Sequence, residues 1–120
     1  MGVAGRVQGG DEMTTPSAIL HATIDTWGVD PRDRCRRRQV SSSRHCMALL
    51  LSVSAFSYSL PEIAELMGRS DHTTALQAKK KGEQRMLDDE RFEGMVVKAA
   101  KRAIRLGAKL PKPEGALWWA

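Results

Sequence analysis

The stretch Ser70-Asp71-His72-Thr73-Thr74 carries side chains suited to reading the edges of base pairs. A histidine can donate a hydrogen bond to a purine acceptor, and a threonine adds a methyl group that can touch the methyl of thymine. Ser70 or Asp71 can cap the start of a helix, and a helix N-terminus favours a nearby phosphate. We therefore expect His72, Thr73 and Thr74 to begin a helix that faces the major groove of DNA.

A short helix and a turn precede this stretch. Ser59 or Leu60 can cap a helix over Pro61 to Met67, Gly68 then breaks it, and a longer helix is expected from about Asp71 to Leu87. Ala64 lies four residues before Gly68, and a small residue there lets the two helices approach closely. The pattern predicts a helix-turn-helix, with an ordinary capped surface helix as the alternative interpretation.

The charge of the chain favours a polyanionic partner. Its 120 residues carry a net charge of +5, with a pI of about 9.6. The basic residues form three groups along the chain. They are Arg32, Arg34, Arg36, Arg37, Arg38 and Arg44; then Lys79, Lys80, Lys81 and Arg85; and then Lys98, Lys101, Arg102, Arg105 and Lys109.

The remaining segments predict an all-α fold of five or six helices. Residues 1–14 read as a disordered leader, with Met13 as an alternative start, residues 15–108 as one domain and residues 109–120 as a tail that ends in Trp118-Trp119. In the first helix Thr15 would be the N-cap, Pro16 the first helical residue and Gly28 the C-terminal cap.

The middle of the chain is expected to alternate loop and helix. A short helical turn is predicted over Val29 to Arg34, followed by an exposed basic loop from Cys35 to Ser43. Ser43 would cap an apolar core helix that reaches about Phe56. The last helix is expected from about Glu90 to Leu106.

Several classes of protein are disfavoured by composition. No apolar run approaches the ~20 residues of a membrane span, and the glycine-rich N-terminus does not resemble a signal peptide, so a cytoplasmic protein is expected. Cys35 and Cys46 fit neither a common zinc spacing nor a redox pair, so we interpret them as two reduced thiols. No metal, cofactor or membrane partner is predicted.

Over Ala18 to Arg105 the sequence resembles the C-terminal DNA-binding domain of the bacterial replication initiators of the DnaA family. The resemblance is strongest at Ser59-Leu60-Pro61-Glu62-Ile63 and at Asp71-His72-Thr73-Thr74. The basic loop and Met47-Ala48-Leu49 match in order and spacing. The resemblance implies an all-α fold with a helix-turn-helix, and double-stranded DNA as the partner.

The resemblance also implies roles for individual residues. The Asp-His-Thr-Thr stretch would read the major groove of a short, asymmetric AT-rich box, and Leu60 and Pro61 would meet a phosphate. Arg37, with Arg36 or Arg38 as alternatives, would enter the adjacent minor groove, which attracts arginine where it is narrow. A solvated linker is the other interpretation of the loop. The predicted DNA-binding residues are Arg36, Arg37, Arg38, Arg44, His45, Leu60, Pro61, Ser70, Asp71, His72, Thr73, Thr74, Lys80 and Lys81.

Four positions depart from the family pattern. His45 stands where an arginine is usual, with Arg44 one place earlier; Val53 replaces a residue that is often basic, and Ser70 replaces an arginine. Gly82 lies inside the recognition helix in place of an apolar residue, which costs about 1 kcal/mol relative to alanine and removes a core contact. The DNA sequence bound is therefore expected to differ from that of the family.

These patterns predict a sequence-specific binder of double-stranded DNA that regulates replication initiation or transcription. The alternative is a protein-interaction module that uses the helix-turn-helix as a scaffold and docks on a protein partner through Trp118-Trp119. Neither prediction involves an enzyme.

The sequence contains no GxxxxGK[ST] phosphate loop, which gives a first testable prediction. We expect calorimetric titration of the chain with ATP to show no saturable binding in the micromolar range. Saturable binding would contradict this prediction.

Overall fold

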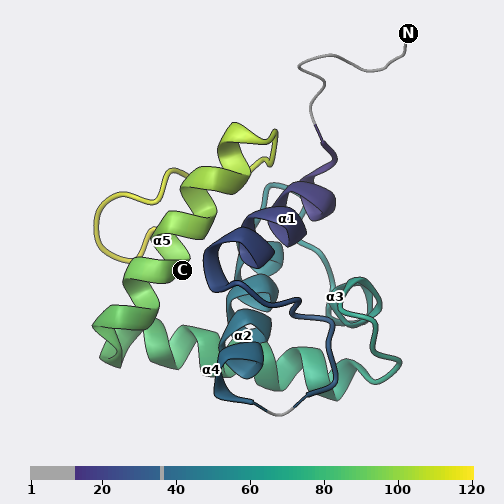
Figure 1. The fold of residues 1–120 in the computed structure, drawn as a ribbon. Helices are drawn as coiled ribbons and strands as arrows, with labels where there is room; N and C mark the ends of the chain where they lie inside the picture. The colour runs from purple at the N-terminus through teal and green to yellow at the C-terminus, as the bar shows by residue number, and fades with distance from the viewer. Residues whose placement is uncertain (1–12, 36) are drawn as a thin grey trace, which may run out of the picture.

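The computed structural model describes residues 13–35 and 37–120, and these residues form five helices without a strand. The helices are α1 (Thr15–Trp27), α2 (Arg38–Val53), α3 (Leu60–Leu66), α4 (His72–Asp88) and α5 (Glu90–Arg105). In Figure 1, α2 runs through the middle, α5 lies beside α1, and α4 crosses α2 on its way to α5. The prediction of an all-α fold is confirmed.

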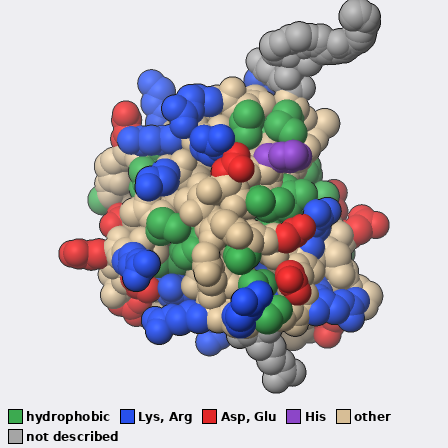
Figure 2. Space-filling model, viewed as in Figure 1, with side chains coloured by type: hydrophobic (Ala, Val, Ile, Leu, Met, Phe, Trp, Pro, Cys, Tyr) green, Lys and Arg blue, Asp and Glu red, His purple; other side chains and the backbone are tan. Residues whose placement is uncertain are grey.

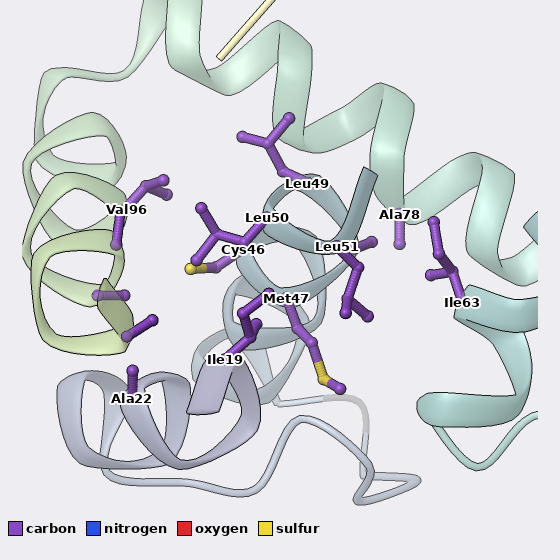
Figure 3. Packing of buried hydrophobic residues seen from close by; sticks show 14 of the residues in the cluster. Ile19, Ala22, Cys46, Met47, Leu49, Leu50, Leu51, Ile63, Ala78 and Val96 are labelled. Carbon is purple, nitrogen blue, oxygen red and sulfur yellow. The ribbon is translucent and has the colours of Figure 1, made fainter. Parts of the chain in front are cut away.

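The core of the molecule is built around α2. From Cys46 to Leu51 every side chain of α2 is at most 1% exposed. A helix buried on all its faces must be covered by several neighbours. Figure 3 shows these neighbours around α2, with Ile19 of α1, Ile63 of α3 and Val96 of α5 among them.

The helix α2 begins earlier than the sequence pattern predicts, so the predicted loop from Cys35 to Ser43 is wrong beyond Arg37. Val40 is only 1% exposed, and Ser42 and Ser43 are also buried. The hydroxyl of Ser43 donates to the carbonyl of Val40 at 2.7 Å, which satisfies a polar group inside the core. Ser43 therefore lies within the helix and is not its cap, and the helix ends at Val53, before Phe56.

Two other predicted elements differ in detail. The predicted helical turn over Val29 to Arg34 is a tight turn at Pro31 and Arg32, where the carboxylate of Asp30 accepts from the backbone N–H of Arg32 at 2.8 Å. Thr14, one residue before the predicted Thr15, caps α1. Its hydroxyl oxygen lies 3.4 Å from the backbone nitrogen of Ser17.

The tail folds back onto the helices. Trp119 is 7% exposed, and the carbonyl of Lys109 accepts from the backbone N–H of Ala55 at 2.9 Å. Of the predicted leader, residues 1–12 lie outside the residues described. In residues 13–35 and 37–120 no helix is both long and apolar enough to span a membrane.

Gly82 lies where α4 packs against α2. A Cβ atom at this position would lie 2.8 Å from the carbonyl oxygen of His45 and 3.4 Å from the Cβ of Leu49. The first distance is too short for a real contact, and a helix backbone cannot move aside easily. The glycine that sequence alone counts as a cost therefore permits the close approach of two helices.

A substitution at Gly82 tests this interpretation. Helix propensity alone predicts that Gly82→Ala stabilises the protein by about 1 kcal/mol. Because the new methyl would collide with backbone, we expect a loss of about 1–3 kcal/mol in the free energy of unfolding, measured by urea denaturation. Gly94→Ala in α5 is the matched control, since its Cβ meets nothing within 4 Å and should stabilise. An equal stabilisation by both substitutions would refute the role of Gly82.

Candidate nucleic-acid interface

A capping box fixes the start of α3. The hydroxyl oxygen of Ser59 lies 3.4 Å from the backbone nitrogen of Glu62, and the carboxylate of Glu62 accepts from the backbone N–H of Ser59 at 2.8 Å. These hydrogen bonds hold the pKa of Glu62 below its usual value. They place Leu60, which is half-buried, and Pro61, which is exposed, in the first turn of α3.

A sharp turn joins α3 to α4. Gly68 has a φ of +73°, a conformation that favours glycine, and the backbone N–H of Arg69 donates back to the carbonyl of Ala64 at 2.8 Å. Ile63 and Met67 are fully buried and anchor both ends of the turn in the core. The turn therefore sets the direction in which α4 begins.

The first residues of α4 face solvent. The carboxylate of Asp71 accepts from the backbone N–H of Thr73 at 2.8 Å, which caps the helix and lowers the pKa of Asp71. Ser70, His72 and Thr73 are exposed, and Thr74 is half-buried. The side chains of His72 and Thr73 are thus accessible, whereas an oxygen of Asp71 is occupied by the cap.

Two lysines continue the same face of α4. Lys80 and Lys81 follow Thr73 and Thr74 by seven residues, which is about two helical turns, and both lysines are exposed. A surface that contacts the start of α4 therefore meets these ammonium groups further along the helix.

The basic loop before α2 is tied to the turn between α3 and α4. The carbonyl of Asp33 accepts from the guanidinium groups of Arg44 at 2.7 Å and of Arg69 at 3.2 Å. Arg44 also donates to the carbonyl of Cys35 at 3.3 Å. Burial, and then the charge of Arg69, lower the pKa of Arg44. We call this arrangement of Asp33, Arg44 and Arg69 the loop clamp.

Arg69 was not among the predicted binding residues. The sequence carries a signal for it: the arginine usual before Asp71 is replaced by Ser70, and an arginine stands one place earlier. Arg44, predicted as a DNA-binding residue, spends hydrogen bonds on the loop backbone, so it positions the loop.

The charges of the loop differ in their availability. Arg32 forms an ion pair with Asp30 at 2.8 Å. Arg37 is exposed at the N-cap of α2, and its Nε lies 3.3 Å from the sulfur of Cys35, whose pKa is lowered by hydrogen bonds from Arg37. Arg38 is exposed in the first turn of α2, whereas Arg36 lies outside the residues described.

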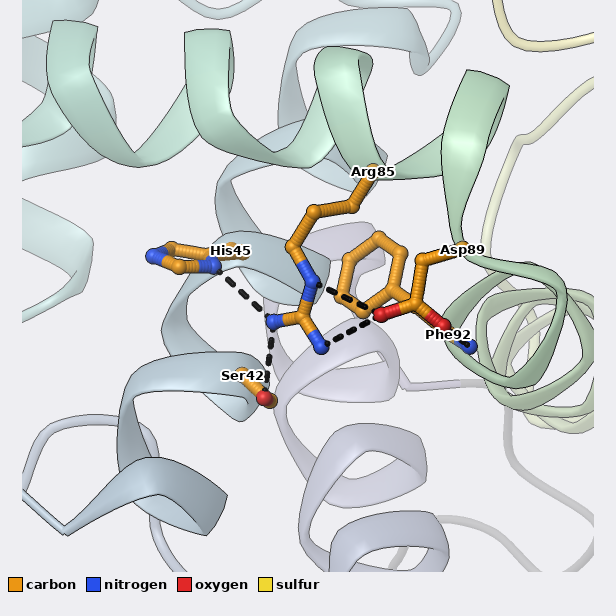
Figure 4. A network of polar contacts seen from close by, with 5 residues as sticks. All are labelled: Ser42, His45, Arg85, Asp89 and Phe92. Atoms are coloured by element: carbon orange, nitrogen blue, oxygen red, sulfur yellow. Dashed lines mark hydrogen bonds and ion pairs between the residues drawn. The ribbon is translucent and has the colours of Figure 1, made fainter.

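Arg85 belongs to the interior of the molecule, although the sequence groups it with exposed lysines. Its Nη1 donates to the hydroxyl of Ser42 at 2.8 Å, and its Nη2 lies 3.1 Å from the carboxylate of Asp89 (Figure 4). The guanidinium carbon also stands 4.2 Å from the ring centroid of Phe92. Arg85 therefore joins α2, α4 and α5 and does not extend the exposed basic group.

His45 is held in its neutral form by this network. Its Nδ1 lies 3.3 Å from Nη1 of Arg85, which can only donate, so the ring accepts there (Figure 4). Burial, followed by the positive charge of Arg85, lowers the pKa of His45 to about 4. At neutral pH this residue offers a phosphate a hydrogen bond at most, and no charge.

The cysteines play no part in this surface beyond the contact of Cys35 with Arg37. Cys46 is buried, and burial raises the pKa of its thiol to about 12. Within residues 13–35 and 37–120 no three His, Cys, Asp or Glu side chains are placed to hold a metal ion.

Curated relatives of this chain include three proteins named chromosomal replication initiator protein DnaA. The one from Gloeobacter violaceus is 36% identical over 92 residues, which are 73% of this chain and 20% of that protein. Those from Thermomicrobium roseum and a Picosynechococcus strain are each 31% identical, over 83% and 72% of this chain and 22% and 20% of their own lengths. The chain thus spans about one fifth of the length of these relatives. No family model matches it.

The loop clamp generates a prediction about local opening. Arg44→Gln and Arg69→Gln should speed tryptic cleavage after Arg34 and Arg37, more for Arg44 because it makes the shorter bond. Global stability should change by less than about 1 kcal/mol in Arg69→Gln, since its contact is exposed. Mass spectrometry identifies the cut sites, and Arg91→Gln, an exposed arginine outside the clamp, is the control. Cleavage in both clamp variants at the rate of the control would show that the clamp does not hold the loop.

Proposed function

Because the chain is homologous to a segment of the chromosomal replication initiator DnaA, we propose that it binds double-stranded DNA at a specific sequence, with α3 and α4 as a helix-turn-helix. The single observation that carries the proposal is the juxtaposition made by the loop clamp. It sets an arginine-rich loop beside the turn that leads into the exposed start of α4. The two parts can then engage adjacent grooves of one duplex.

The start of α4 supplies the base contacts in this proposal. His72 and Thr73 project from the first turn, where a helix placed in the major groove meets base edges. Their hydrogen bonds and the threonine methyl distinguish base pairs. Lys80 and Lys81 on the same face contact phosphates and hold the helix in the groove. Asp71 supports this readout by fixing the first turn.

The loop supplies the second set of contacts. Arg37 enters the minor groove next to the major groove that α4 occupies, and Arg38 contacts the backbone. A narrow AT-rich groove has a strong negative potential, so arginine there favours AT-rich flanks. Leu60 and Pro61 meet a phosphate at the start of α3, as the resemblance implies. Arg44 and Arg69 act indirectly, by holding the loop.

The biological consequence is control of a DNA transaction by occupancy of a site. A chain that binds sequences similar to initiator boxes competes with the initiator for them, which regulates replication initiation or transcription from nearby promoters. The alternative, a protein-interaction module anchored by the tail, loses support because Trp119 is packed into the core. A buried tryptophan is not available as an anchor.

A paired substitution separates electrostatic contacts from base contacts. Five exposed cations, Arg34, Arg37, Arg38, Lys80 and Lys81, surround the proposed interface. If each neutralises one phosphate, the logarithm of the association constant should fall with the logarithm of salt concentration with a slope of about −4 to −5. Arg37→Ala should reduce that slope by about one and weaken AT-rich sites more than GC-rich sites. Thr73→Ala should cost about 1–3 kcal/mol on the preferred site and leave the slope unchanged.

Fluorescence-anisotropy titrations at several salt concentrations measure both effects, after the preferred site has been selected from a random pool of duplexes. Circular dichroism should show an unchanged helical signal in both variants, because both side chains are exposed. A flat salt response of the wild type would reject duplex binding. Full discrimination by Thr73→Ala and by His72→Ala would reject the assignment of α4 as the recognition helix.

A further inference from the structure

The third basic group of the sequence has no role in the proposed interface. Lys98, Lys101, Arg102 and Arg105 all lie in α5 and are all exposed. Their spacing of three, four and seven residues puts them on one face of the helix, along about 10 Å of its axis. We call this set the α5 stripe. The opposite face of the helix, with Val96, Ala99 and Ala103, is buried in the core.

The α5 stripe carries an excess of positive charge. The sequence has no acidic residue between Glu93 and Glu114. Among residues 13–35 and 37–120, the ion pair of the stripe joins Arg102 to Asp25 of α1 at 2.7 Å. Figure 2 shows a group of lysine and arginine side chains at the upper left, over the C-terminal half of α5 as it stands in Figure 1.

This surface lies away from the proposed interface. The C-terminal half of α5 is at the top of Figure 1, whereas α3 and the start of α4 are at the lower right. The corner between α4 and α5 separates them and carries the acidic residues Asp88, Asp89, Glu90 and Glu93. A straight duplex on the start of α4 would leave the α5 stripe uncovered.

We propose that the α5 stripe binds the phosphate backbone of a second duplex segment, so that one molecule bridges two stretches of DNA. This proposal rests on the proposed function, which supplies the first duplex. Contacts from lysine and arginine to phosphates need no base recognition, and release of counterions provides the free energy. A row of cations about 10 Å long can follow neighbouring phosphates of one strand.

The chemistry of the stripe favours DNA over an acidic membrane or a protein. A helix that binds a membrane surface inserts an apolar face, but the apolar face of α5 is buried against the core. The centre of a protein interface is rich in large apolar or aromatic side chains. The exposed large hydrophobic residues, Phe56, Leu87 and Leu117, all lie outside the α5 stripe. What remains is a purely electrostatic surface.

A two-duplex capture assay tests the proposal. The preferred duplex is fixed to a surface, the protein is added, and retention of a second, fluorescent duplex of random sequence is measured. Lys98→Gln/Lys101→Gln removes two charges of the stripe and leaves the ion pair of Arg102 and the last helical turn intact. Arg91→Gln/Lys112→Gln removes two exposed charges elsewhere and is the matched control.

Each phosphate contact is worth roughly a factor of eight near 0.1 M salt, so the stripe variant should retain the second duplex at least about tenfold less well than the wild type. Its binding to the fixed duplex, and both properties of the control, should change by less than about threefold. If the wild type binds the fixed duplex but captures no second one, bridging is wrong while the proposed function stands. If the wild type binds no duplex at all, the proposed function itself fails.

Other sources of capture give opposite results. Capture that survives in the stripe variant would arise from association of two protein molecules, and would overturn the proposal. Co-sedimentation with anionic lipid vesicles is measured in parallel. If the stripe substitutions abolish vesicle binding but leave duplex capture unchanged, the stripe serves a membrane surface and the proposal is again overturned.

Discussion

The close contact between Gly82 of α4 and the carbonyl of His45 in α2 governs the geometry of the whole interface. The basic loop leads directly into α2, and the exposed His72 and Thr73 begin α4. The distance and angle between these two helices therefore decide how the loop stands relative to the start of α4. A side chain at Gly82 would push the helices apart and displace one set of contacts from the other.

The network of Arg85 supports the same contact from the next turn of α4. Its guanidinium reaches Ser42 on α2, while Asp89 both accepts from Arg85 and caps α5 through the backbone N–H of Phe92 at 3.0 Å. A single side chain thus orients three helices. The same positive charge keeps His45 neutral. The cation that the sequence suggests for phosphate binding serves the interior, and the duplex is left to the lysines earlier in α4.

Local patterns in the sequence predicted the elements whose ends depend on neighbouring residues. The capping roles of Ser59 and Asp71 and the break at Gly68 follow from hydrogen bonds and backbone conformations within a few residues, so they are visible in sequence. The start of α2 was missed because Val40 stands alone among serines and arginines, and its burial depends on distant helices. The roles of Arg85 and Arg69 likewise depend on partners more than thirty residues away. Which exposed residues contact DNA stays a prediction.

The loop clamp grips a main-chain oxygen. The carbonyl of Asp33 is present whatever side chain stands at that position or at its neighbours, so Arg44 and Arg69 can hold the loop while its own sequence drifts. Anchoring and recognition are thereby assigned to different atoms. A family of such proteins can change the side chains that its loop presents without first losing the scaffold, and new target preferences can arise by single substitutions.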